Sequence, residues 1–284
     1  MARLLKGAPV ASSLVERAAS CAARLRERGI VPTIQMVRVG DRGDDLAYER
    51  AAEKRCRAAG IDVRRLCLEK GCDQAHLNGA IEAIGAQDDV HGILLFRPLP
   101  PQLSEEAASI CVPAGKDVDC LGPLGLLDTL AGRGDGFAPC TAEAVLALLD
   151  FYEIPLDGAN VVVIGRSLVI GRPVAALLLS RNATVTTCHT HTRDLPALCR
   201  KADIIVCAAG VPGTVGAECV GRDQVVVDVG TTWDAASGRL VGDVSFDDVE
   251  PLVSAITPVP GGVGSVTTAV LATHVVKAAE RMCQ

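Results

Sequence analysis

Apolar residues recur along the first half of the chain at two spacings, one typical of helices and one of buried strands. Helical spacing covers three segments, 10–28, 44–59 and 73–84. Gly29 and Gly60 end the first two, and Asp73 is an acidic N-cap for the third. Short apolar runs predict strands at 33–39, 63–68 and 91–96. Because strands and helices alternate, we expect an α/β layer with a mostly parallel sheet.

The second half repeats this alternation around residues 160–179, NVVVIGRSLVIGRPVAALLL. An apolar run ends at Gly165, and a helical pattern begins at Gly171. Further strands are predicted at 183–188, 203–207, 224–229 and 253–256; helices are predicted at 141–152, at 171–180 and after the loop 257–264. This order is typical of a doubly wound sheet. Residues 111–140 are rich in Gly, Pro and Asp, and we place the domain boundary near their end.

The turn between Gly165 and Gly171 is a candidate phosphate site. A turn from a buried strand into a helix presents backbone N–H groups and the positive helix end to an anion. The dinucleotide fingerprint is G-x-G-x-x-G, whereas five residues separate the two glycines here. From general rules alone, a nucleotide site and an ordinary strand–helix turn are equally supported.

Composition narrows the class of protein. The chain has 284 residues, 49% of them hydrophobic, and a net charge of −6, which argues against nucleic-acid binding. No apolar run is long enough to span a membrane, and the N-terminus lacks the core of a signal peptide. Twelve cysteines form no C-x-x-C pair and five histidines are scattered, so no metal site is predicted. A reduced cytoplasmic enzyme is expected.

Several motifs then occur together in one order: KDVDC (116–120), PCT (139–141), GRSLVIGRP (165–173), DVG (228–230), GDV (242–244) and TPVPGGVG (257–264). With these motifs the chain resembles the methylenetetrahydrofolate dehydrogenase/cyclohydrolase family over nearly its whole length. The resemblance implies an α/β folate-binding domain, residues 1–140 completed by the C-terminal helix at 265–284. It also implies a Rossmann-like nucleotide-binding domain at 141–264, an active-site cleft between the two, and a homodimer that acts on one-carbon derivatives of tetrahydrofolate.

The resemblance also assigns site residues. Tyr48 and Asp119 are the expected catalytic residues and border or hold the pterin ring, which a carboxylate can bind through two parallel hydrogen bonds. Substrate would further contact Pro260, Gly261, Gly262 and Val263. The expected cofactor-binding residues are Thr141, Gly165, Arg166, Ser167, Gly171, Arg172, Pro173, His189, Thr190, Ala209, Gly210, Asp228 and Gly230.

Two positions depart from the family pattern in a way that bears on chemistry. The family has Tyr-x-x-x-Lys on the active-site helix and Gln at the end of the third strand, whereas this chain has Ala52 and Phe96. Lys54 lies on another face of the helix, and Arg97 is one residue out of register. The family's pocket residues are also replaced at Asp44, Asp45, Cys120 and Ser265.

These departures affect the family's two reactions differently. Hydride transfer from methylene-tetrahydrofolate needs alignment with the nicotinamide but no general base. Opening the methenyl product with water needs proton transfers, the work of the missing Lys and Gln. We therefore expect a dehydrogenase with weak or absent cyclohydrolase activity.

The cofactor is expected to be NADP, with NAD as the alternative. Arg166 suits a 2′-phosphate, and TTCHTHT (186–192) has no acid for a free ribose hydroxyl. His191, where the family often has a basic residue, weakens this preference. Two other functions remain open: a catalytically silent paralogue that acts as a scaffold, and a dehydrogenase of another cyclic aminal.

Overall fold

The computed structural model describes residues 1–235 and 238–283. The chain divides into two compact units, and the division falls within four of the helices. The three-stranded unit contains Ser12–Thr129, Arg133–Cys140 and the chain from Thr268 onward. The six-stranded unit contains Met1–Ala11, Leu130–Gly132 and Thr141–Thr267. The first eleven residues, expected in the folate-binding domain, thus group with the six-stranded unit.

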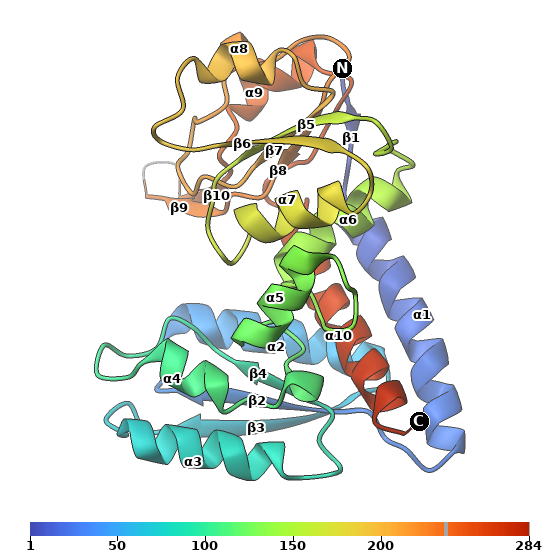
Figure 1. Ribbon diagram of the computed structural model, residues 1–284, viewed down its shortest axis with the longest axis vertical. Coiled ribbons are helices and arrows are strands. Elements are labelled where there is room, and N and C mark those ends of the chain that lie inside the picture. Colours follow the sequence, from blue (N-terminus) through green and yellow to red (C-terminus); the bar gives the residue numbers. More distant parts are fainter. Residues whose placement is uncertain (236–237, 284) are drawn as a thin grey trace. The chain divides into compact units, whose positions relative to one another are not determined.

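The three-stranded unit is built on a parallel sheet of order β3-β2-β4. Its strands are β2 (Thr33–Val39), β3 (Asp62–Leu68) and β4 (Gly92–Leu95). Its other elements are α1 (Gly7–Glu27, most of it in this unit), α2 (Gly43–Ala58), α3 (Gln74–Gly85), α4 (Glu105–Ile110), η1 (Ala114–Lys116), α5 (Pro123–Ala131) and most of α10 (Gly264–Arg281). Helices α2 and α3 lie on opposite faces of the sheet (Figure 1).

The six-stranded unit is built on a second parallel sheet, of order β1-β11-β8-β7-β5-β6. Its strands are β1 (Arg3–Leu4), β5 (Asn160–Ile164), β6 (Thr184–Cys188), β7 (Ile204–Cys207), β8 (Val225–Asp228) and β11 (Ala255–Ile256). Its helices are α6 (Cys140–Phe151), α7 (Gly171–Leu179), α8 (Leu195–Cys199), η2 (Ala217–Cys219), α9 (Phe246–Val249) and η3 (Glu250–Leu252). Strands β9 (Thr232–Asp234) and β10 (Arg239–Val241) form an antiparallel pair.

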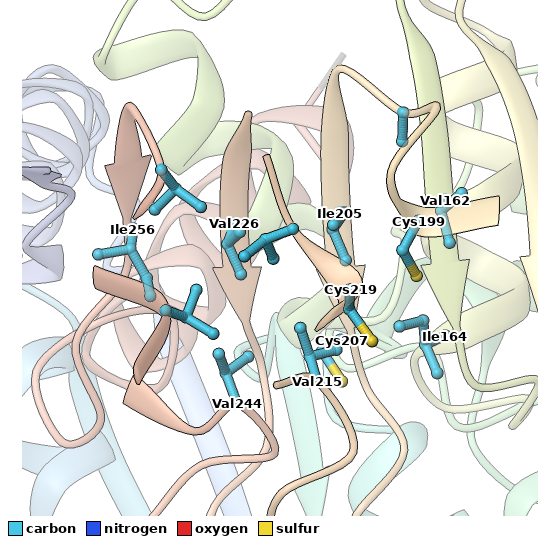
Figure 2. Packing of buried hydrophobic residues seen from close by; sticks show 14 of the residues in the cluster. Val162, Ile164, Cys199, Ile205, Cys207, Val215, Cys219, Val226, Val244 and Ile256 are labelled. Atoms are coloured by element: carbon cyan, nitrogen blue, oxygen red, sulfur yellow. The ribbon is translucent and has the colours of Figure 1, made fainter. Parts of the chain in front are cut away.

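The core of the six-stranded unit explains why its strands read as continuous apolar runs. All four residues of β7, Ile204–Cys207, are buried, and so are the four of β8, Val225–Asp228. Figure 2 shows Val162, Ile205 and Val226 from three neighbouring strands packed with Cys199 and Cys219. A strand covered by helices on both sides has no solvent face, so it needs no polar alternation.

The predicted strands and long helices agree with the structure to within a few residues, and Asp73 caps α3 by accepting from the His76 N–H. No element was predicted within 111–140, where the structure has η1 and α5. The sequence PLGLLDTLA of α5 begins with Pro at the first helical position, and the Gly and Pro around it masked its helical pattern. The short elements β1, α4, α8, α9, β9 and β10 were also not predicted.

All twelve cysteines are free thiols. No helix among the described residues is long and apolar enough to cross a lipid bilayer.

Candidate active site

The turn after β5 requires glycine at both of its ends. Gly165 has φ of +123°, and a Cβ there would lie 2.2 Å from the Ala208 carbonyl oxygen. A Cβ on Gly171 would lie 2.2 Å from the Gly165 oxygen. Only residues without side chains allow the loops after β5 and β7 to approach this closely. The predicted glycine turn is therefore built for close backbone approach.

The residues between these glycines prepare an anion site. The Ser167 hydroxyl accepts from the Ile170 N–H at 3.1 Å and the Gly171 N–H at 3.4 Å, which organises the start of α7. Arg166 and Arg172 are exposed at this end, Pro173 is buried, and the first turn has no acidic residue. A helix N-terminus flanked by two guanidinium groups suits a phosphate.

The other expected cofactor residues follow neighbouring strands of the same sheet. His189 and Thr190 follow β6, and Ala209 and Gly210 follow β7. The carboxyl ends of parallel strands meet at one sheet edge, which is where α/β folds bind ligands. The imidazole of His191 lies 6.0 Å from that of His189, measured between ring centroids. Thr141, another expected cofactor residue, is the second residue of α6.

Asp228 stands apart from the other expected cofactor residues because its side chain is used within the protein. It is 3% exposed, and its carboxylate accepts the N–H groups of Gly230, Asp243 and Val244 at 3.0 Å each. Burial, the dominant influence, raises its pKa to about 6. The carboxylate therefore holds the chain after β8 in place.

Asp243, which sequence reasoning had not singled out, holds the chain after β7. Its Oδ2 accepts the N–H groups of Ala209 at 2.7 Å and Gly210 at 2.8 Å. Its Oδ1 is buried without a hydrogen-bond partner among the described residues. The GDV motif contained this residue, but a motif does not show whether its carboxylate faces a ligand or the backbone.

The glycine loop between β11 and α10 belongs to the six-stranded unit. Gly261 has φ of +107° and accepts the Gly7 N–H at 2.8 Å. A Cβ on Gly262 would lie 2.6 Å from the Pro258 oxygen, and Val263 is 1% exposed. Pro260 is exposed and follows a cis peptide bond. The positive φ disfavours a side chain at Gly261, and a close backbone contact excludes one at Gly262.

In the three-stranded unit, the two altered positions lie beside Tyr48. Tyr48 and Ala52 are one turn apart on α2, and Ala52 is fully buried. Phe96 directly follows β4 and packs edge to face on the Tyr48 ring, with centroids 6.0 Å apart. Burial, with a smaller contribution from Asp119, raises the pKa of Tyr48 well above its ordinary value. The phenol is therefore neutral and can donate a hydrogen bond.

Asp119 is partly exposed in the same unit, among groups of mixed charge. Burial, the largest influence, raises the pKa of its carboxyl, and three neighbours oppose this shift: Cys140, Arg97 and His274. Sequence reasoning had not identified Cys140 or His274. The PCT motif contained the cysteine, whereas no pattern in the sequence connects residue 274 to residue 119.

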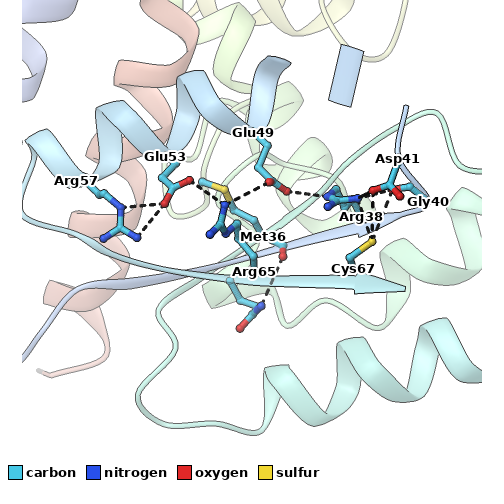
Figure 3. Close-up of polar contacts among 10 residues, drawn as sticks. Met36, Arg38, Gly40, Asp41, Glu49, Glu53, Arg57, Arg65 and Cys67 are labelled. Carbon is cyan, nitrogen blue, oxygen red and sulfur yellow. Dashed lines mark hydrogen bonds and ion pairs between the residues drawn. The ribbon is translucent and has the colours of Figure 1, made fainter. Parts of the chain in front are cut away.

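A chain of ion pairs holds α2 against its sheet (Figure 3). Glu49 on α2 pairs with Arg38 on β2 at 3.0 Å and with Arg65 on β3 at 3.9 Å. Arg65 also pairs with Glu53, one turn further along α2, at 3.4 Å. The Glu49 side chain is only 7% exposed. These pairs fix the helix that carries Tyr48.

A cavity of about 670 Å³ opens at the carboxyl ends of the three strands in this unit. Its walls come from the segments after β2, β3 and β4, at 39–42, 67–70 and 98–101. In the order β3-β2-β4 the chain places β3 on one side of β2 and then crosses back to place β4 on the other side. The loops that follow the strands diverge at such a point and leave a crevice. No cluster of three or more metal-ligating side chains was found in 1–235 or 238–283.

Comparisons with known proteins agree with this arrangement. Residues 5–119 match the model "Tetrahydrofolate dehydrogenase/cyclohydrolase, catalytic domain", and residues 139–283 match "Tetrahydrofolate dehydrogenase/cyclohydrolase, NAD(P)-binding domain". The Bifunctional protein FolD of Carboxydothermus hydrogenoformans is 49% identical over 281 residues, 99% of this chain and 98% of that protein.

Solved structures give the same result. The bifunctional FolD enzyme of Campylobacter jejuni superposes with a TM-score of 0.96 at 36% identity and covers 99% of both chains. The Trypanosoma brucei FolD, solved with NADP cofactor and inhibitor, gives 0.93 at 34% identity, covering 100% of this chain and 99% of that one. The chain described here therefore belongs to the tetrahydrofolate dehydrogenase/cyclohydrolase family, with an α/β catalytic domain followed by a Rossmann-like NAD(P)-binding domain.

Proposed function

We propose that the protein transfers a hydride between 5,10-methylene-tetrahydrofolate and NADP, giving 5,10-methenyl-tetrahydrofolate, and has little or no cyclohydrolase activity. The hydride leaves the methylene carbon with its electron pair, and the adjacent folate nitrogens stabilise the resulting cation. No proton moves in that step, so the reaction depends on alignment. Bound NADP supplies the hydride acceptor.

One observation carries the second half of this proposal: Phe96 packs on the Tyr48 ring, Ala52 lies one turn from Tyr48 on α2, and neither can relay a proton. Hydrolysis of the methenyl group needs an activated water and a protonated leaving nitrogen. Tyr48 keeps its proton at neutral pH, because burial raises its pKa. No acid–base pair at the family's Lys and Gln positions remains for that work.

The residues of the six-stranded unit support a dinucleotide. The glycine cradle at 165 and 171, the hydroxyl of Ser167 and the exposed Arg166 and Arg172 suit its phosphates. Arg166 would pair with a 2′-phosphate, and the absence of an acid at 189–192 favours NADP over NAD. We assign residues 141–264 to this domain and 1–140 with 265–284 to the folate domain, and we infer a cytoplasmic homodimer.

The test is a spectrophotometric assay with methylene-tetrahydrofolate and each nicotinamide cofactor, following the methenyl product. The proposal predicts that methenyl accumulates at the rate at which the reduced cofactor forms. Enzyme-dependent loss of methenyl absorbance would contradict the missing cyclohydrolase. Calorimetry without binding of either ligand would instead favour a silent scaffold, and cofactor binding without folate binding would favour another cyclic aminal as substrate.

A further inference from the structure

The segment Lys116–Asp119 is fixed to the three-stranded unit at each of its first three residues. The buried Lys116 amine donates to the carbonyls of Gly85 at 2.8 Å and Gln87 at 2.6 Å. The buried Asp117 carboxylate accepts the N–H groups at 121 and 122, at 2.8 and 2.7 Å. Asp119 is the one residue of the four that is partly exposed. The segment is therefore held in place, with only Asp119 partly exposed.

The third attachment uses two side chains from distant helices. The Val118 carbonyl oxygen accepts from the His274 Nδ1–H on α10 at 2.8 Å and lies 3.3 Å from the Cys140 Sγ at the start of α6. Val118, Cys140 and His274 are each at most 1% exposed. The hydrogen bond to a carbonyl also places the ring proton on Nδ1. Because Val118 is bonded to Asp119, this carbonyl sets the direction of the next residue.

The same two side chains act on the Asp119 carboxylate. Cys140 and His274 both lower the pKa of this carboxyl, against the larger effect of burial. The His274 ring is itself held by the Phe137 ring, 4.9 Å away between centroids. A buried imidazole and thiol add little to a core that aliphatic residues fill more easily, and each needs a polar partner there. Their polar atoms converge on residues 118 and 119.

We propose that His274 and Cys140 are positioning residues that hold the Asp119 carboxylate in the orientation in which it binds the pterin. This inference rests on the proposed function, which makes Asp119 the pterin anchor. In this proposal the two residues act on the folate site through Asp119, although Cys140 directly precedes Thr141. Their loss should therefore weaken folate binding and leave dinucleotide binding unchanged.

Four variants at these positions test the idea through the KM for folate and the KM for NADP. His274→Leu and Cys140→Ala remove a donor and should raise the folate KM about 10-fold, with the NADP KM within 2-fold of wild type. His274→Asn keeps an N–H near the Nδ1 position and Cys140→Ser keeps a hydroxyl donor, so both should recover most of the loss.

Val275→Ala is the matched control, because Val275 is equally buried on α10 and its truncation removes no donor. It should lower the melting temperature and leave both KM values unchanged. Equal folate KM values for His274→Leu, Val275→Ala and wild type would overturn the proposal. If His274→Leu does not accumulate as folded protein, the comparison of Cys140→Ala with Cys140→Ser decides.

The two proposals fail in different ways. Wild-type enzyme without folate turnover would refute the proposed function whatever the variants do. Turnover that is insensitive to residues 140 and 274 would refute the positioning role alone.

Discussion

The ring of Phe96 meets the ring of Tyr48 edge to face, with their planes at 77°. Phe96 therefore occupies space beside the phenol with an apolar side chain that is 5% exposed. A charged group introduced at position 52, one turn from Tyr48, would enter the same apolar surroundings. This contact determines how far lost chemistry can be restored by substitution.

Ala52→Lys alone should recover little cyclohydrolase activity, because Phe96 gives the ammonium no hydrogen-bonding partner and desolvation lowers the lysine pKa. The double variant Ala52→Lys/Phe96→Gln should increase enzyme-dependent methenyl hydrolysis, up to the 10²–10⁴-fold typical of acid–base help. Loss of methenyl absorbance measures the rate. Ala51→Lys, at the exposed neighbouring position, is the control for added charge. Equal rates in the control and the double variant would refute the assignment of these positions.

Arg166→Ala should change cofactor selectivity. A charge-assisted contact to the 2′-phosphate is worth about 1.5–3 kcal/mol, so the KM for NADP should rise about 10–150-fold and that for NAD much less. Steady-state kinetics with both cofactors measure this. Arg222→Ala, also exposed in the six-stranded unit, controls for the lost positive charge. Equal kinetics with NADP and NAD in the unmutated enzyme would remove the basis of the prediction.

Glu49→Leu should destabilise the three-stranded unit by about 2 kcal/mol, because it leaves the half-buried Arg38 guanidinium with Asp41 as its remaining carboxylate partner. The double variant Arg38→Leu/Glu49→Leu should come within about 1 kcal/mol of wild type, since replacing both members by apolar residues removes the buried charge. Urea unfolding provides the measurement.

Asp62→Ala is the comparison for this ion pair. It breaks the exposed pair with Arg26, whose atoms also lie 3.0 Å apart, and should cost less than about 1 kcal/mol. A double variant as unstable as Glu49→Leu would show that the buried pair contributes favourably in its own right.

The pH dependence of stability should reveal Asp228. Its pKa is raised by burial from 3.8 to about 6, so the folded state holds the proton more tightly than the unfolded state. Its contribution to the free energy of unfolding therefore falls as pH rises from about 4 to 6, by about 2–3 kcal/mol. The difference in unfolding free energy between wild type and Asp228→Asn should follow this trend. A difference that stays constant between pH 4 and 7 would contradict it.

Much of the fold was predictable because its long elements carry their own periodicity. Val161–Ile164 form an apolar run whatever their partners are, and Gly165 and Gly171 lie where backbone contacts exclude a Cβ. Strand β1 could not be predicted, since two exposed residues have no pattern and become a strand only by pairing with β11. Helix α5 was missed because flanking glycines and prolines dominated its local signal.

The place of a candidate site residue in the fold was predictable where the residue lies within its own motif. The turn at Arg166 and Ser167 is such a case, as is Tyr48 on α2. The roles of Asp243 and His274 depend on hydrogen bonds between distant segments. Asp243 is 34 residues from its partner Ala209, and His274 is 156 residues from its partner Val118. Asp228 lies in a motif and was expected to bind cofactor, but its carboxylate accepts hydrogen bonds from the backbone amides of 230, 243 and 244.

The pairing of β1 with β11 also sets the order in which the molecule can be completed. Arg3 lies opposite Ala255 and Leu4 opposite Ile256, so β1 occupies the sheet edge beside the strand of this sheet that is furthest from it in the sequence. Strand β1 therefore stays unpaired until β11 has been synthesised. Such a distant contact is formed late in folding and slows its final step. During translation, β1 therefore lacks its strand partner, and is open to proteases and chaperones, until β11 is available.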